Sequence, residues 1–277
     1  MKGIKKFGFG GIVLSLILIL ALVPFIIMII GSIKPNMTFS IVPIDMSPFS
    51  NTTLKNYESV LETVNITQAF RNSLFILIFV VVAEVVLAIM AGYIFAIKEF
   101  PCKKLLFGLV IVTMMLPKQL LLVPNFMVAK KLHLINTLAG VALTTINASY
   151  GIFLTRQYVL TIPKEFYEAA KIDGCGELSI FLKIILPFLK PVMAAIAIYS
   201  MFNVWNDYLW QNVMLSSETN QTVPLMLAYL SNKISNGFPV VGLQMAGSVI
   251  AIAPVLTFFI VFQKWFIEGI TVGGVKE

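Results

Sequence analysis

The chain has 277 residues, of which 58% are hydrophobic and only 12% are charged. Because soluble domains carry roughly 25% charged residues, this composition excludes an ordinary soluble protein and indicates an integral membrane protein. The formal net charge of +7 does not point to nucleic acid, since the Lys and Arg residues are scattered along the chain rather than gathered on one face with aromatic residues between them.

Long apolar runs divide the chain into about six segments, each long enough for a helix that crosses a hydrocarbon layer about 30 Å thick. These runs are continuous and do not alternate as barrel strands do, which favours helices over a β-barrel. We therefore predict an all-α membrane protein with a single transmembrane domain over residues 1–277. The predicted spans cover residues 12–33, 72–97, 105–129, 134–154, 187–213 and 243–266, with a polar loop at 156–186.

Prolines interrupt the third predicted span at Pro117 and Pro124, with Lys118 and Gln119 between them. Breaks at membrane depth are tolerated where the freed backbone faces protein or a cavity. This segment therefore either lines a path or acts as a gate hinge, or it is a purely structural kink.

The distribution of Lys and Arg predicts the orientation. With a cytoplasmic N-terminus, most of these residues fall in cytoplasmic connections, as the positive-inside rule requires, although the pair Lys130–Lys131 opposes it. Both termini would then be cytoplasmic. Cys102 and Cys175 would lie in cytoplasmic connections, where thiols stay reduced, so we expect no disulfide. The lone His133 and the two distant cysteines match no metal-ligand spacing, so no metal site is predicted.

The most polar stretch, residues 165–187, reads EFYEAAKIDGCGELSIFLKIILP and separates two apolar blocks. Pro163 and Glu165 predict a helix start, because proline is tolerated in the first turn and an acidic residue there interacts favourably with the helix dipole. Gly174 and Gly176 should end this short helix before a second one begins. We expect a helix-turn-helix that projects from the membrane into the cytoplasm.

The spacing of this stretch resembles the EAA loop of bacterial ATP-binding cassette importer permeases. Trp205 and Asn206 in the fifth span, together with the C-terminal residues, resemble the carbohydrate-uptake branch, of which the smaller maltose permease subunit is a familiar member. The positions that match in the loop are Glu168, Ala169, Ala170, Asp173, Gly174, Ile184, Leu186 and Pro187, and those in the tail are Gly269, Thr271, Gly273 and Lys276.

The resemblance implies a multi-pass permease of the bacterial plasma membrane that imports sugars, with oligosaccharides as the leading class. The loop would be a coupling helix seated on an ATPase subunit, and the tail would contact the ATPase dimer. The implied partners are a second homologous permease, two ATPase subunits and an extracytoplasmic solute-binding protein. The chain has no phosphate-binding G-x-x-x-x-G-K-[ST] motif, so we expect it to be no enzyme and to bind no cofactor; ATP and magnesium would be bound by the ATPases.

An ionisable residue in a span is expensive in hydrocarbon and usually faces protein or a water-filled path. Glu84, in the second span, shares a helical face with Ala88, Ala91 and Gly92. Small residues on one face predict tight helix packing, so a structural hydrogen bond explains Glu84 as well as a role in transport does.

The fifth span carries a polar stripe in which residues recur at spacings of three and four. Amides and a carboxylate suit sugar hydroxyls, and aromatic faces suit the apolar side of a sugar ring. An interface with the second permease explains the stripe equally well. The stripe consists of Ser200, Asn203, Asp207 and Gln211, and the candidates for a substrate path are Asn203, Asn206, Asp207, Trp205, Trp210 and Glu84.

Two other functions stay open. One is a permease for glycerol phosphate or another polyol. The other is an ion-coupled secondary carrier that uses Glu84 and Asp207 as ion sites. A membrane-embedded enzyme is disfavoured, because no nucleophile–base pair and no catalytic cluster is evident in the sequence.

Overall fold

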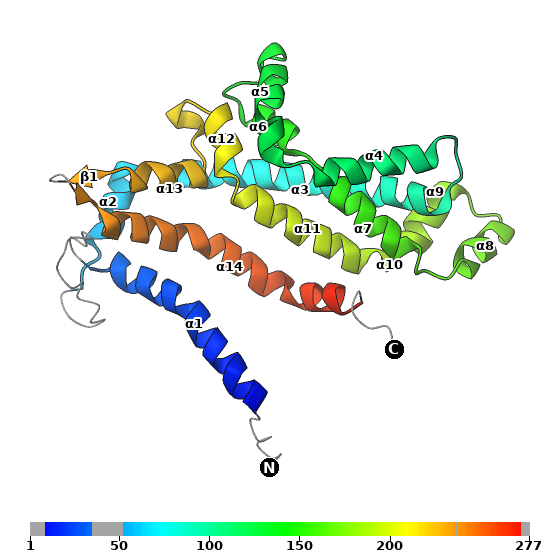
Figure 1. The fold of residues 1–277 in the computed structure, drawn as a ribbon, viewed down its shortest axis with the longest axis horizontal. Helices are drawn as coiled ribbons and strands as arrows, with labels where there is room; N and C mark the ends of the chain where they lie inside the picture. The colour runs from blue at the N-terminus through cyan, green and yellow to red at the C-terminus, as the bar shows by residue number, and fades with distance from the viewer. Residues whose placement is uncertain (1–8, 35–51, 236–237, 273–277) are drawn as a thin grey trace. The chain divides into compact units, whose positions relative to one another are not determined.

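The computed structural model describes residues 9–34, 52–235 and 238–272, and helices dominate it (Figure 1). The described strands β1 (Ile234–Ser235) and β2 (Phe238–Pro239) form only one short antiparallel pair. The all-α prediction is therefore confirmed. The helices are α1 (Phe9–Ser32), α2 (Lys55–Thr63), α3 (Ile66–Ile97), α4 (Lys103–Met115), η1 (Lys118–Leu121), α5 (Leu122–Lys131), α6 (Leu138–Thr145), α7 (Ser149–Val159), α8 (Glu165–Ile172), α9 (Glu177–Ser179), the π-helical η2 (Ile180–Ile185), α10 (Leu186–Phe188), α11 (Lys190–Trp205), α12 (Tyr208–Met214), η3 (Glu218–Asn220), α13 (Val223–Ser231) and α14 (Val241–Val272).

Within the described residues, two helices are long and apolar enough to cross a membrane: Gly10–Ser32 of α1 and the whole of α3. Three further candidates are bent pairs of helices. They are Lys103–Met115 with Lys118–Lys131, bent by 98°, Leu138–Thr145 with Ser149–Val159, bent by 43°, and Glu177–Phe188 with Lys190–Trp205, bent by 73°.

The chain divides into two compact units, and the first contains Met1–Ile66 and Met226–Leu256. In this unit the Asn56 amide of α2 donates hydrogen bonds to the carbonyl oxygens of Ser32 and Lys34, both 2.8 Å long. Gly242 at the start of α14 lies directly against Asn56, since a Cβ there would come within 2.6 Å of the amide nitrogen. These contacts join α2 to the end of α1 and the start of α14.

The second unit contains Thr67–Leu225 and Thr257–Glu277, and α7 packs against α3, α4 and α11 within it. Small residues allow the close approach of α3 and α7. A Cβ at Gly151 would lie 2.6 Å from the Cβ of Ala88, and one at Gly92 would clash with Thr155. The tight packing predicted for the face shared by Glu84 and Ala88 is therefore present.

Two predicted spans are interrupted where the sequence suggested continuity. The fourth breaks between α6 and α7, where the Asn147 side chain accepts a hydrogen bond from the Ser149 N–H (3.2 Å). The fifth breaks after Trp205, because the Asp207 side chain caps α12 by accepting from the Trp210 N–H (3.2 Å). Asn and Asp favour such caps and turns over helix interiors. The break in the third span falls at Pro117, between α4 and η1, as predicted.

Candidate functional site

The polar loop forms the expected helix-turn-helix. Helix α8 carries Glu165 and Glu168 in its first turn and Lys171 in its last, a charge order that the helix dipole favours. Gly174 then adopts a φ of +74°, a left-handed conformation that glycine reaches without strain. No atom lies within 4 Å of where its Cβ would be, so the backbone conformation alone requires glycine here.

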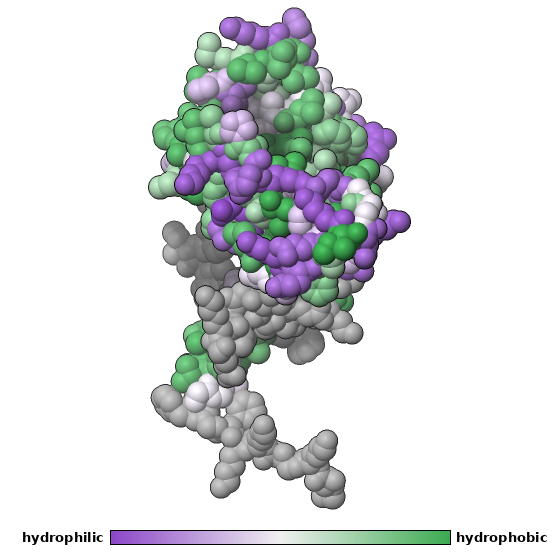
Figure 2. Space-filling model, turned by 90° about the vertical axis from the view of Figure 1, so that its right-hand side faces the viewer, coloured by the Kyte–Doolittle hydropathy of each residue, from purple (hydrophilic) through white to green (hydrophobic). Residues whose placement is uncertain are grey.

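The tip of this loop exposes apolar side chains. Ile172 is 86% exposed and Leu178 is 71% exposed, and Phe166 is also exposed. On the face where α8 and α9 lie, Figure 2 shows hydrophilic residues gathered around hydrophobic ones. A surface hollow beside α8 is lined by Glu165, Phe166, Ala169, Ala170, Asp173, Cys175 and Ile184.

The other side of the loop packs into the chain's own core. Ala170 is buried in a cluster with Ile180 and Ile185, whereas its neighbour Ala169 is exposed. Of the residues matched to the EAA loop, Glu168 and Asp173 are exposed with Ala169 and Gly174, Ile184 and Leu186 are half-buried, and Pro187 is exposed in α10. The matched positions therefore supply both an outer surface and the packing that holds it.

A polar clamp that the sequence analysis did not single out joins the loop to the end of α3. Lys98 Nζ donates to the Tyr167 hydroxyl (3.0 Å), which donates to Glu177 Oε1 (3.0 Å), and Lys98 also pairs with Glu177. The ammonium of Lys171 lies 4.9 Å from the centre of the Tyr167 ring. We name Lys98, Tyr167 and Glu177 the loop clamp.

The two charged members of the loop clamp stabilise each other's ionised form. The hydrogen bond from Lys98 lowers the pKa of Glu177. Burial acts to lower the pKa of Lys98, but its hydrogen bonds with Glu177 and Tyr167 outweigh this effect and raise the pKa. Both groups therefore stay charged near neutral pH, and the clamp persists there.

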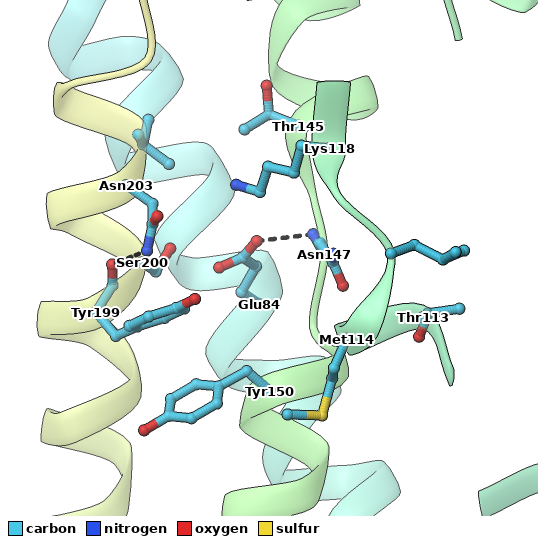
Figure 3. A pocket seen from close by; sticks show the side chains of 12 residues that line it. Glu84, Thr113, Met114, Lys118, Thr145, Asn147, Tyr150, Tyr199, Ser200 and Asn203 are labelled. Carbon is cyan, nitrogen blue, oxygen red and sulfur yellow. Dashed lines mark hydrogen bonds between the residues drawn. The ribbon is translucent and has the colours of Figure 1, made fainter. Parts of the chain in front are cut away.

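A polar cavity of about 130 Å³ lies between α3, α7 and α11 (Figure 3). Glu84, which is 8% exposed, lies at its centre and accepts a hydrogen bond from the Asn147 N–H (2.7 Å). This bond supports the interpretation of Glu84 as a structural hydrogen-bonding residue. Its position in the cavity leaves a role in transport open. The cavity is lined by Glu84, Thr113, Met114, Leu116, Lys118, Thr145, Asn147, Tyr150, Tyr199, Ser200, Asn203 and Val204, and we name it the first cavity.

A second cavity, of about 420 Å³, adjoins the first and shares Thr113, Lys118, Thr145 and Asn147 with it. Asp207 and Trp210 line this second cavity, and the Trp210 indole N–H donates to the Thr144 hydroxyl (2.9 Å). The break at Pro117 places Lys118 in the lining of both cavities, so the interrupted span does line a polar space.

The remaining path candidates lie elsewhere. Trp205 is buried with its ring edge against Phe70, the ring centres 6.1 Å apart, so it packs the fold. Asn206 is exposed and its amide donates to the Phe202 carbonyl oxygen (2.8 Å). Gln211 is buried and accepts from the Thr222 hydroxyl, because the helix break at Asp207 turns it away from the stripe.

The structure adds residues to the cavities that the sequence did not indicate. Tyr150 and Tyr199 line the first cavity with their ring centres 4.3 Å apart. These tyrosines carry no charge that would single them out in the sequence. The one available signal was their closeness in sequence to the polar residues Asn147 and Ser200. Of the tail residues, Gly269 and Thr271 fall within α14, while Gly273 and Lys276 lie outside the described residues.

Comparison with known proteins identifies the family. Residues 84–272 match the family described as "Binding-protein-dependent transport system inner membrane component". The chain is 42% identical over 207 residues to the arabinooligosaccharides transport system permease protein AraQ of Halalkalibacterium halodurans, covering 75% of this chain and 73% of that protein. It is 35% identical over 265 residues to the AraQ protein of Bacillus subtilis, covering 93% and 92%.

A solved structure supports the fold. It is described as a bacterial ABC transporter involved in the import of the acidic polysaccharide alginate, and one of its chains superposes with a TM-score of 0.81 at 22% identity, covering 96% of this chain and 99% of that one. The resemblance inferred from the EAA spacing is thus confirmed by whole-chain similarity. The chain belongs to the family of inner membrane permease subunits of binding-protein-dependent ATP-binding cassette transport systems.

Proposed function

We propose that the chain is the permease subunit of an ATP-driven importer of sugars, with oligosaccharides as its substrate class. A second homologous permease would complete the translocation path, and an extracytoplasmic solute-binding protein would deliver the sugar. Two separate ATPase subunits would bind ATP and magnesium. Their closure would move the coupling loops and rock the two permeases between outward-open and inward-open states.

The exposed loop tip is the observation that carries this proposal. Ile172, Leu178 and Phe166 all expose large apolar side chains in this one loop outside the apolar spans, where a partner could cover them. Glu168, Ala169 and Asp173 would contact the ATPase together with this tip. Ala170, Ile184 and Leu186 would support it from behind, with Gly174 setting the turn and Pro187 in the exposed part of α10.

The arrangement in the membrane extends the same proposal. We assign residues 1–277 to one permease domain with six spans and cytoplasmic termini, α14 being the sixth span. In this orientation the clamped loop is cytoplasmic. The tail residues Gly269, Thr271, Gly273 and Lys276 would also contact the ATPase dimer.

The substrate class rests on the relatives and on the charges of the cavities. Both AraQ proteins are named for arabinooligosaccharides. Glu84 lines the first cavity, Asp207 lines the second and Lys118 lines both. Each cavity therefore has one carboxyl group and one ammonium group in its lining, a mixed polar lining that suits the hydroxyl groups of a neutral sugar. Membership of a binding-protein-dependent family also speaks against an ion-coupled carrier.

Reconstitution tests the proposal. The complete importer in proteoliposomes with internal ATP should take up at least one of arabinotriose, raffinose and maltotriose in preference to sn-glycerol 3-phosphate. Uptake should require hydrolysable ATP and the binding protein. Uptake of glycerol 3-phosphate alone, or sugar uptake driven by an ion gradient without ATP, would overturn it.

A further inference from the structure

The first cavity contains a buried hydroxyl group without a partner. Ser200 on α11 is 1% exposed, and its Oγ makes no hydrogen bond to any described residue. Buried polar groups normally find a partner, because leaving one unpaired costs more than a made hydrogen bond gains. The Thr145 hydroxyl, on another wall of the same cavity, is also buried and has no partner among the described residues.

Two other serines in this chain donate hydrogen bonds to carbonyl oxygens of their own helices, whereas Ser200 does not. The Ser231 hydroxyl donates to the Ala228 carbonyl oxygen (2.8 Å), and the Ser248 hydroxyl donates to the Gln244 carbonyl oxygen (2.9 Å). A helical serine can satisfy its hydroxyl in this way. The hydroxyls of Tyr93 and Thr155 also lack a partner among the described residues, but these residues line neither cavity. Ser200, in the middle of α11, differs from them because it lines a polar cavity that an external partner can enter.

The groups around Ser200 are those that bind a sugar ring. Glu84 uses Oε1 for the Asn147 N–H, and its Oε2 accepts no hydrogen bond from the described residues. The Asn203 amide nitrogen donates to the Tyr199 carbonyl oxygen (2.8 Å), which leaves its Oδ1 toward the cavity lining as an acceptor. Tyr150 and Tyr199 add a pair of aromatic rings, suited to the apolar face of a sugar.

Size limits what the first cavity holds. Its volume of about 130 Å³ is well below the roughly 300 to 1,000 Å³ of pockets that enclose drug-sized ligands. One sugar ring suits it, whereas the adjoining cavity of about 420 Å³ can receive further rings. The shared wall of Thr145 and Asn147 makes the two spaces continuous in their lining.

We propose that the first cavity is a subsite of this permease for one neutral sugar ring of an oligosaccharide, with Ser200, Glu84 and Asn203 hydrogen bonding its hydroxyl groups. The subsite rests on the proposed function, since it assigns the imported sugar a place on this chain. It makes Ser200 and Thr145 ligand-binding residues and gives Tyr150 and Tyr199 the role of an apolar wall.

The test uses the complete importer in proteoliposomes and the trisaccharide among arabinotriose, raffinose and maltotriose that the wild type takes up fastest. Ser200→Ala should lower uptake per assembled complex at subsaturating sugar by about 3- to 10-fold, the loss expected for one hydrogen bond. Its melting temperature should not fall, because the hydroxyl has no partner among the described residues. Ser231→Ala, which removes a hydroxyl bonded only to its own helix, is the matched control and should leave uptake unchanged.

Monodeoxy analogues of the same trisaccharide sharpen the result. The analogue that lacks the hydroxyl bound by Ser200 should be taken up poorly by the wild type but lose nothing further in Ser200→Ala, since both changes remove one interaction. The binding protein's own preference cancels, because it is the same in both importers. Glu84→Gln keeps an acceptor for the Asn147 N–H and should also lower sugar uptake.

The possible results distinguish failure of the proposed subsite from failure of the proposed function. A wild type that takes up glycerol 3-phosphate and no trisaccharide would overturn the proposed function itself. Normal uptake by Ser200→Ala in an importer that transports sugar would overturn the subsite alone and leave a cavity filled by water. Reduced uptake that follows a lower melting temperature, with no loss per assembled complex, would overturn the subsite too and assign Ser200 a structural role.

Discussion

Replacing Gly174 with valine should uncouple the importer while leaving the spans folded. Gly174 has a φ of +74°, and a β-branched residue held there costs on the order of 1 to 3 kcal/mol. No atom lies within 4 Å of the added Cβ, so steric clashes contribute nothing and the strain is confined to the turn. A penalty of this size lowers the population of the native turn about 5- to 150-fold if nothing compensates it.

Gly176, two residues further on, provides a matched control. A Cβ added at Gly176 would also have no atom within 4 Å, but the φ of −68° at this position is open to any residue. Gly176→Val should therefore leave the turn intact, although both variants add the same side chain to the same loop. Gly174→Asn should retain part of the activity, because asparagine tolerates the left-handed region better than valine does.

The assay measures sugar uptake and sugar-stimulated ATP hydrolysis in the reconstituted importer, each corrected for the amount of assembled complex. Gly174→Val should lose both together, Gly176→Val should keep both, and Gly174→Asn should fall between them. Normal coupling in Gly174→Val, or an equal loss in Gly176→Val, would refute the argument that the turn conformation positions the loop.

Three further predictions concern orientation, the loop clamp and the path. Cys102 and Cys175 are both exposed and should react with an impermeant thiol reagent only from the cytoplasmic side; labelling in intact cells would reverse the orientation. Lys98→Glu and Glu177→Lys should each impair coupling, and the double variant should recover part of it if the two charges act as a pair. Since the pKa of Glu177 is lowered, the clamp's contribution is present above the ordinary carboxylate pKa and lost as pH falls through the lowered one, so coupling should not titrate near neutral pH. Asn203→Ala should reduce uptake per assembled complex, whereas an interface role would instead reduce the yield of complex.

The sequence predicted the loop well because its signals are local. The acidic first turn, Gly174 and the fixed spacing from Glu168 to Pro187 all act within one short segment, and the structure forms the helix, the turn and the next helix in that order. The apolar runs likewise predicted the helical class, since the membrane leaves a chain few other ways to satisfy its backbone.

The positions of the helix breaks were predictable only in part. Pro117 marked its break, but Asn147 and Asp207 lie inside apolar runs that were predicted to be continuous helices. Their side chains cap or turn the backbone there. Asp207 also lines the second cavity, so its interpretation as a path residue stays a prediction. The break at Asp207 then rotates Gln211 into the core, which a stripe drawn on one straight helix could not anticipate.

The cavities and the loop clamp depend on contacts between distant segments. Lys98 and Glu177 lie far apart in the sequence, and neither local stretch indicates that the two side chains meet. Tyr150 and Tyr199 meet because α7 packs on α11, and the sequence of neither helix predicts this packing. The charge and helical spacing of Glu84 were enough to predict it from the sequence. The uncharged residues around it could be identified only from the fold.

A photo-cross-link from Ile172 would show whether this loop contacts a separate ATPase subunit, as coupling requires. Ile172 is 86% exposed at the tip of the loop, and Leu132, 61% exposed in a connection assigned to the outer side, is the control. With p-benzoyl-phenylalanine at each position of the purified importer, we predict an adduct with the ATPase subunit from Ile172 and none from Leu132. If the importer transports sugar but gives no ATPase adduct from Ile172, or gives one from Leu132, this loop is not the part of the chain that docks on the ATPase.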